Sequence, residues 1–578
     1  DVYRISVEDN GPGIVRRKIP EVFGRLLYGS RFHAVRQSRG QQGIGISGVV
    51  MYAQLTTAKP AIIISKVEHE DVAHEITLFL DVKRNRPEVV KEEVLIWKGE
   101  DGSPKKHGTR VTVDVKGRYI KGKQSVYEYL KGTAIVNPHA RITFTDPEGN
   151  KMVFERMATT MPRPTVEIKP HPHGIELGTF LSMLKETRAR HLYTFLATEF
   201  SSVSTMKAKE VCAKAGMDPM LKPGMLSRND AAKIMKAFAE VRLRPPDTNC
   251  LSPIGEELIR KGLKHVLGGK AEYYTTPITR PPKVYSGNPF QVEVGIVYGG
   301  DLPKDRPVEI LRFANKVPLL YQAGACAITK AISSVDWRRY GLDQRGGEGI
   351  PYGPAIILVH VASTKIPYTS EAKEAIAPVP EIVDEIVLAL QKAGRMLKTH
   401  LSKKKKRGKV REKFELVQEI LPEIAGKSAK ILNRPVPNLV PVITKIMNVV
   451  WIKSSISCDG GVCKLTINTV NYTGGEKELN LYTRIPREVI GSARFAPEPD
   501  EKHSDGRIGW RLRVKSGEMH RVEVEMYGVE SDEISSVEVY FDGINPVHVI
   551  GAEPLPGDWG IESLRVKKVR LEGGAHGE

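Results

Sequence analysis

A glycine-rich stretch near the N-terminus has the composition of an anion-binding loop. Residues 39–48 read RGQQGIGISG and hold four glycines, so backbone N–H groups there can approach a ligand closely. Apolar residues follow at once (Val49, Val50 and Met51), which predicts that the loop enters the first turn of a helix. Unpaired amides and the helix dipole both favour negative charge at such a terminus. By itself, the pattern also fits a glycine-rich turn without a ligand.

A carboxylate lies upstream of this loop, at the end of a predicted strand. Asp9 follows the alternating residues 2–7 and precedes Gly11 and Gly13. It can accept a hydrogen bond from an exocyclic amine such as that of adenine, and the two glycines would let the ring pass close to the backbone. The other interpretation is an Asx-turn. Further on, Thr109 begins another strand, where its hydroxyl could support the Asp9 carboxylate.

The elements that position these residues divide the chain into four predicted domains. Short strands alternate with helices over 1–165, which indicates one α/β layer. Prolines and helical spacing mark a helical domain over 166–270. The pattern over 271–435 returns to α/β and ends in a long helix, and short alternating runs over 440–578 predict an immunoglobulin-like β-sandwich. The fold class is therefore multidomain α/β with an all-β C-terminal domain.

Several elements are predicted in detail. In the first domain, strands are expected at 2–7, 61–65, 76–80, 94–97, 109–115 and 142–145. In the second, Ser204 should cap a helix, Ser227 with Asp230 should form a capping box, and Ser252-Pro253 should begin another helix.

A lysine in the third domain lies on a loop after a buried strand. The apolar run 355–361 predicts that strand, and Lys365 follows it, either as a surface residue or placed to reach a ligand outside its own domain. The long helix from about residue 380 runs into the basic stretch 403–409, and a further helix is expected at about 410–432. The basic stretch is either solvated or in contact with DNA phosphates.

Composition favours a polyanionic partner. The 578 residues hold 87 Lys and Arg against 68 Asp and Glu, a net charge of +19, which is typical of nucleic-acid binding but also of a general solubility charge. Lys116, Arg118 and Tyr119 form a basic and aromatic loop suited to phosphate contacts and stacking, or simply a solvated turn. No apolar run is long enough for a membrane span. Five scattered cysteines fit a reducing cytoplasm without a disulfide framework or a metal site, although Cys458 and Cys463 could pair in a hairpin.

The motifs D-x-G-x-G, G-x-x-G-x-G and G-T, in this order, resemble the Bergerat ATP-binding fold of the GHKL ATPases. The segments LYGSRFH (27–33), RGQQGIGISG (39–48) and YAQLTT (52–57) are similar to the B subunits of archaeal topoisomerase VI, a type IIB DNA topoisomerase. The resemblance covers about residues 1–435. It implies that 166–270 is a helix-two-turns-helix domain and that 271–435 is a transducer domain with stalk helices.

The resemblance also implies a binding site for ATP and Mg²⁺. Asp9 would contact adenine with Gly11, Gly13 and Thr109 beside it, and Ser30 and Arg31 would line a lid. Lys365 would be the switch lysine that contacts the γ-phosphate. The phosphates would lie on Gly40, Gln41, Gln42, Gly43, Ile44, Gly45 and Ile46.

One part of the family's pattern is missing. The family carries a helix upstream of the aspartate, with a glutamate that activates water and an asparagine that helps to hold Mg²⁺, and nothing before Asp9 here supplies either. The sequence also opens without a methionine. We therefore expect either that an N-terminal segment is absent from this sequence or that this chain binds ATP without hydrolysing it, so the general base is not among its residues.

The function implied by the resemblance is that of the ATPase subunit of a cytoplasmic, nucleoid-associated topoisomerase. ATP would dimerise two B subunits and drive one DNA duplex through a double-strand break made by the A subunit, in a heterotetramer of two A and two B subunits. Supercoils would be relaxed and DNA decatenated. The alternative is a GHKL-type protein clamp or chaperone.

Overall fold

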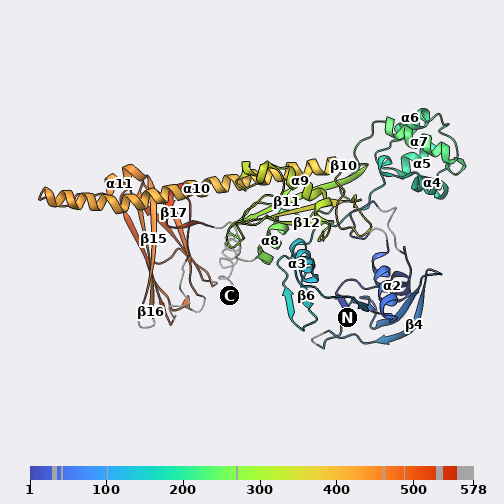
Figure 1. Cartoon of the computed structure of the whole chain (residues 1–578), viewed down its shortest axis with the longest axis horizontal. Coiled ribbons are helices and arrows are strands. Elements are labelled where there is room, and N and C mark those ends of the chain that lie inside the picture. The colour runs from blue at the N-terminus through green and yellow to red at the C-terminus, as the bar shows by residue number, and fades with distance from the viewer. Residues whose placement is uncertain are drawn as a thin grey trace, which may run out of the picture. The chain divides into compact units, whose positions relative to one another are not determined.

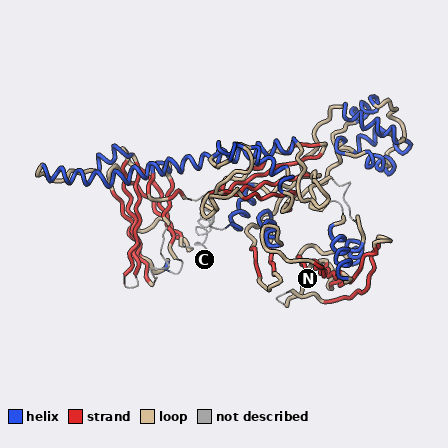
Figure 2. Tube along the Cα trace, in the orientation of Figure 1, coloured by secondary structure: helices blue, strands red, loops and turns tan. Residues whose placement is uncertain are grey.

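The computed structural model describes most of the chain, namely residues 1–28, 35–40, 43–99, 102–267, 271–459, 462–486, 489–504, 506–528 and 538–555. It divides into two units, Asp1–Lys398 and Thr399–Glu578. Figure 1 labels the elements and Figure 2 separates helices from strands. Within the described ranges, no helix combines the length and the apolar character needed to cross a membrane.

The N-terminal part is built on a five-stranded sheet in the order β1-β5-β2-β3-β4. All of its neighbouring strands are antiparallel. The helices α1 and α2 share a hydrophobic core with the sheet, in which Ile63 and Leu78 are fully buried. Its elements are β1 (Val2–Asp9), α1 (Ile19–Gly24), α2 (Gly45–Thr57), β2 (Ala61–Lys66), β3 (Ala73–Asp81), β4 (Arg86–Leu95), β5 (Gly108–Lys116), α3 (Val126–Val136), β6 (Ile142–Thr145) and β7 (Lys151–Phe154). The predicted strands are present, although β4 begins earlier than expected.

Helices α4 to α7 enclose a separate core rich in phenylalanine, in which Phe180, Phe195, Phe200 and Phe238 pack together. The caps that the sequence predicts are confirmed, because each depends on residues only three positions apart. Ser204 Oγ accepts from Lys207 N at 3.3 Å, and Ser227 forms the complete capping box with Asp230. The helices are α4 (Leu177–Glu186), α5 (Leu192–Glu199), α6 (Thr205–Lys214) and α7 (Arg228–Glu240).

The prediction that a helix begins at Ser252-Pro253 is wrong. Helix α8 (Glu256–Leu267) begins after them. The backbone N–H groups of Ile254 and Gly255 donate instead to the carboxylate of Glu293, each at 2.7 Å. A distant side chain therefore determines where this helix starts.

A second sheet has the order β10-β11-β14-β12-β13, with β8 and β9 also paired to β11. Every residue of β14 is buried, as its apolar run predicts. The elements are β8 (Tyr273–Tyr274), β9 (Ile278–Thr279), β10 (Lys283–Tyr285), β11 (Asn288–Tyr298), β12 (Glu309–Ala314), β13 (Val317–Pro318), α9 (Ala327–Ser334) and β14 (Ala355–Ser363).

The expected division of the stalk into two helices is also wrong. Helix α10 (Pro380–Ile431) is one continuous helix of 52 residues that includes both the basic stretch and Pro422. Lys and Arg are good helix formers, so a run of them need not end a helix.

The second unit contains a β-sandwich of two five-stranded sheets, ordered β18-β21-β16-β15-β23 and β19-β20-β17-β22-β24. Residues of both sheets share one core, including Leu465 and Trp510. Its elements are α11 (Val440–Met447), β15 (Val449–Asp459), β16 (Val462–Tyr472), β17 (Lys477–Arg484), β18 (Arg494–Ala496), β19 (Glu501–Lys502), β20 (Arg507–Val514), β21 (Met519–Tyr527), β22 (Val539–Asp542), β23 (Val549–Ile550) and β24 (Glu553–Pro554).

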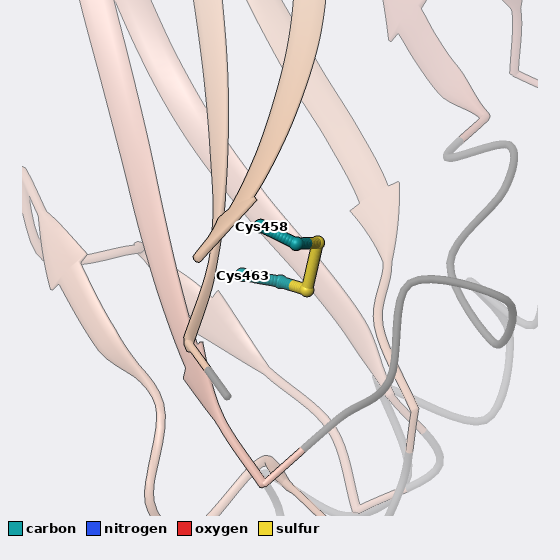
Figure 3. The surroundings of a disulfide bond; sticks show 2 residues. All are labelled: Cys458 and Cys463. Carbon is teal, nitrogen blue, oxygen red and sulfur yellow. A yellow bond between two sulfur atoms is a disulfide. The ribbon is translucent and has the colours of Figure 1, made fainter. Parts of the chain in front are cut away.

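The cysteines are all accounted for. Cys458 and Cys463 face each other across the β15–β16 hairpin and form a disulfide, so their pairing is confirmed (Figure 3). Cys212, Cys250 and Cys326 are free and buried. Burial raises the pKa of the Cys212 and Cys250 thiols to about 11.

Candidate functional site

Asp9 and Thr109 lie opposite each other where β1 pairs with β5. Asp9 Oδ1 accepts from Gly11 N at 2.8 Å and from Thr109 N at 3.3 Å. The first bond is the Asx-turn interaction that was one of the two interpretations of the sequence. The second connects the D-x-G-x-G motif to the G-T motif. Asp9 is exposed, and no hydrogen bond in the described ranges involves its Oδ2, which leaves this oxygen able to accept from a ligand.

The expected contact between the Thr109 hydroxyl and Asp9 is replaced by a backbone contact. Thr109 Oγ1 lies 3.0 Å from Ser65 Oγ instead. Ser65, which the sequence did not single out, also accepts from Ile14 N at 2.8 Å and donates to Gly108 O at 3.1 Å. Its only sequence signal is its position as the polar last residue of an apolar strand prediction. Ser65 thus connects the turn after Asp9 to the start of β5.

Two glycines at this end of the sheet are required by close backbone packing. A Cβ on Gly13, whose φ is +74°, would lie 2.0 Å from the carbonyl oxygen of Lys66. A Cβ on Gly108 would lie 2.3 Å from the carbonyl oxygen of Asp9. These glycines fix the turn that presents Asp9.

The glycines of the loop at α2 are different. A Cβ on Gly40, Gly45 or Gly48 would meet no atom within 4 Å. No packing constraint among the described residues therefore explains them. Helix α2 begins at Gly45, and its N-cap residue Ile44 provides no side-chain cap. A helix terminus without a side-chain cap is of the kind that can bind an anion.

Helix α2 packs against β5. Near its C-terminus, Thr57 Oγ1 donates to Asp114 O at 3.1 Å, and Tyr52 Oη donates to Lys116 O at 2.9 Å. These contacts fix the second half of α2 on the strand that carries Thr109.

Four of the predicted site residues, Ser30, Arg31, Gln41 and Gln42, lie outside the described residues. Gly43 lies within them with φ +69°, and its carbonyl oxygen accepts from Leu27 N at 3.1 Å.

Lys365 follows β14 on the loop that the sequence predicts, and it makes an exposed ion pair. Its Nζ donates to Glu176 Oε1 at 2.9 Å, and the two side chains are 57% and 77% exposed. The hydrogen bond from Lys365 lowers the pKa of Glu176. An ion pair this exposed contributes only about 0–1 kcal/mol, so Lys365 can leave it at small cost. The structure does not bring Lys365 into contact with the described residues of the glycine loop.

The basic segment after β5 is open to solvent. Lys116 and Arg118 are exposed and Tyr119 is half-buried. No carboxylate within the described ranges pairs with Lys116 or Arg118, whereas Lys121 pairs with Glu148 at 2.7 Å. Among all the residues that the structure describes, no group of three His, Cys, Asp or Glu side chains could hold a metal ion.

Known proteins identify the family of this chain. Residues 246–413 match the family model described as the topoisomerase VI B subunit transducer. The B subunit of type 2 DNA topoisomerase 6 from Methanococcoides burtonii is 44% identical over 562 residues, covering 96% of this chain and 88% of the relative. That of Archaeoglobus fulgidus is 46% identical over 551 residues, covering 93% and 89%.

Because this identity extends over most of the length of both proteins, the resemblance to this family is confirmed. The chain belongs to the family of type 2 DNA topoisomerase 6 B subunits.

Proposed function

We propose that this chain is the ATP-driven gate of a type IIB DNA topoisomerase. ATP binds between Asp9 and the N-terminus of α2 and dimerises two copies of the chain around one duplex. The transducer part then moves with the nucleotide state, and a second duplex passes through a break made by the A subunit. The observation that supports the proposal is that the family's two nucleotide motifs supply, on the same small domain, a helix terminus without a side-chain cap and a carboxylate whose Oδ2 makes no hydrogen bond with the described residues.

The α2 terminus suits a triphosphate because no side chain caps it and a Cβ on Gly40, Gly45 or Gly48 would meet no described atom within 4 Å. Mg²⁺ would arrive with the nucleotide, because phosphate oxygens are ligands that it prefers. Lys365 is proposed to exchange its exposed contact with Glu176 for the γ-phosphate. Its role is to report whether that phosphate is present.

The A subunit is proposed to dock on the second half of α10. Four large apolar side chains there are solvent-exposed at helical spacing: Leu416, Ile420, Ile424 and Ile431 are 56%, 41%, 55% and 83% exposed. An apolar stripe of this kind is typical of a protein interface. We propose a heterotetramer of two A and two B subunits.

Gly45→Ala separates ligand binding from folding. The new Cβ would meet no described atom within 4 Å outside its own helix and chain neighbours, so the free energy of unfolding should change by no more than about 1 kcal/mol. It would, however, enter the space that a phosphate needs, and ATP affinity should fall by about tenfold. Calorimetric titration with ATP and urea unfolding measure the two effects.

The matched control is Gly13→Ala, where a Cβ would collide with the backbone. This variant should lose about 2–4 kcal/mol of stability. If Gly45→Ala leaves ATP affinity unchanged, the phosphates do not bind at the start of α2.

Duplex DNA is proposed to contact Lys116, Arg118 and Tyr119. Each phosphate neutralised by a cation adds about 0.9 to the salt slope of the binding constant. The double variant Lys116→Ser/Arg118→Ser should therefore reduce that slope by about two. Fluorescence anisotropy with a labelled duplex at several salt concentrations gives the slope.

Lys121→Ser is the control from the same segment, because Lys121 is already paired with Glu148. Its slope should stay near that of the unmodified chain. An unchanged slope in the double variant would remove this segment from the DNA path. The absence of any steep slope in the unmodified chain would favour the alternative function, an ATP-dependent clamp on a protein client.

A further inference from the structure

A two-residue turn in the second sheet has an unusual sequence for its geometry. Asn315 and Lys316 connect β12 to β13 with φ values of +48° and +65°. Such a hairpin turn has positive φ at both central positions, and glycine is strongly preferred at the second. A lysine there is sterically unfavourable, so the contacts of its side chain must offset that cost.

The side chain of Asn315 joins two segments that are far apart in sequence. Asn315 is 3% exposed. Its Nδ2 donates to Ser38 O at 3.1 Å and to Ser363 O at 2.9 Å, and its Oδ1 accepts from Ser363 N at 2.9 Å. Ser38 lies just before the glycine loop, and Ser363 is the last residue of the strand that leads to Lys365. One amide group therefore contacts both segments proposed to touch the phosphates.

Lys316 makes a second connection between the same regions. Its Nζ donates to Ser252 Oγ at 2.9 Å, and Ser252 N donates to Gln37 Oε1 at 2.6 Å. On the other side, Lys316 N donates to His360 Nε2 on β14 at 3.0 Å. The segment that enters the glycine loop is thus held at Gln37 and Ser38 by two successive residues of one turn.

We infer that the Asn315–Lys316 turn is a positioning element that couples the glycine loop to the Lys365 loop. It makes no contact with the nucleotide itself. It fixes the register between Ser38 and Ser363, so a displacement of the glycine loop on phosphate binding is transmitted to the strand end that carries Lys365. This inference rests on the proposed function, and it names residues that act through Lys365 and not on ATP directly.

Asn315→Gly tests the coupling in the full chain. Glycine adopts positive φ readily, so the turn should persist while both side-chain connections of Asn315 are lost. The measurement compares affinities for ADP and for a non-hydrolysable ATP analogue. We expect ADP affinity to stay within about twofold and the preference for the ATP analogue to fall by about tenfold.

Lys365→Ala is the reference variant and Asn448→Gly the matched control. Lys365→Ala should lose the preference for the ATP analogue while ADP affinity is nearly unchanged. The double variant Asn315→Gly/Lys365→Ala should lose no more than Lys365→Ala alone, because both changes break one coupling. Asn448 is another asparagine with φ +50°, in the second unit, and its replacement should leave both affinities unchanged.

The outcomes distinguish a failure of this inference from a failure of the proposed function on which it rests. If Asn315→Gly keeps the preference that Lys365→Ala abolishes, the coupling is overturned and the switch role of Lys365 stands. Equal losses for ADP and the ATP analogue would mean that Asn315 only supports the fold, which also overturns the coupling. If Lys365→Ala itself changes nothing, the proposed switch fails and the coupling with it.

Discussion

Asp9→Ala should lower ATP affinity by about 10- to 100-fold and remove the preference for ATP over GTP. The reason is that the two oxygens of this carboxylate have different partners. Oδ1 is held by the N–H groups of Gly11 and Thr109, which leaves Oδ2 to accept from the exocyclic amine of adenine. Calorimetric titration with the two nucleotides measures both effects.

Asp81→Ala provides a control for the turn itself. Asp81 lies at the end of β3 in the same sheet, and its Oδ1 accepts from Lys83 N at 3.0 Å and Arg84 N at 3.1 Å. The Asp81→Ala variant therefore loses similar turn hydrogen bonds, but Asp81 has no proposed contact with the nucleotide. ATP binding should stay unchanged. ATP bound as tightly and as selectively by Asp9→Ala would contradict the adenine pocket.

Glu293→Gln should destabilise the first unit by about 3–5 kcal/mol, as is typical when a buried charged network loses one partner. Glu293 is fully buried. One of its oxygens accepts from His360 Nδ1 and Ile254 N, each at 2.7 Å. The other accepts from Gly255 N at 2.7 Å and Thr279 Oγ1 at 2.9 Å. A glutamine would turn an NH₂ group toward two of these donors, and urea unfolding measures the loss.

The stability lost in the Glu293→Gln variant should depend on pH in a definite direction. Burial acts to raise the pKa of Glu293, but the hydrogen bonds from His360 and the two backbone amides outweigh it and hold the pKa below its usual value. A lowered pKa stabilises the fold above the unfolded value, near about 4.3, and this contribution is lost as the pH falls below it. The difference between Glu293→Gln and the unmodified chain should therefore shrink in acid.

Glu385→Gln is the corresponding control. Glu385 is also buried, but it forms its ion pair with a single group, Arg280 Nε, at 2.6 Å. It should lose less stability than Glu293→Gln. Equal losses would mean that the number of donors around Glu293 does not determine its contribution.

Local patterns in the sequence predicted most of the elements. Strands such as β2 and β14 follow from apolar runs, and the Ser227–Asp230 capping box follows from two residues on one helical turn. The start of α8 could not be predicted in this way, because the amides of Ile254 and Gly255 donate to Glu293, which lies on β11. The basic stretch in α10 suggested a boundary, yet its residues are compatible with a helix and the chain continues through them.

The candidate site was predictable in its motifs and not in its connections. Asp9, Thr109 and the glycine loop were singled out by residue type and order. Ser65 was missed because a serine at a strand end carries no distinctive pattern. The contact of Asn315 with Ser38 spans 277 residues and that of Ser252 with Gln37 spans 215. Such contacts form only when segments far apart in the sequence pack together, so no local pattern predicts them.

The state of the cysteines makes the chain well suited to site-directed labelling. Two of the five thiols are consumed by the disulfide, and the other three are buried. The thiolate is the reactive form, and burial keeps Cys212 and Cys250 protonated at neutral pH. A maleimide dye should therefore react with a cysteine introduced at an exposed position, such as Leu55→Cys on α2, in preference to the native thiols. Fluorescent probes can report nucleotide-driven movement without first removing the native cysteines.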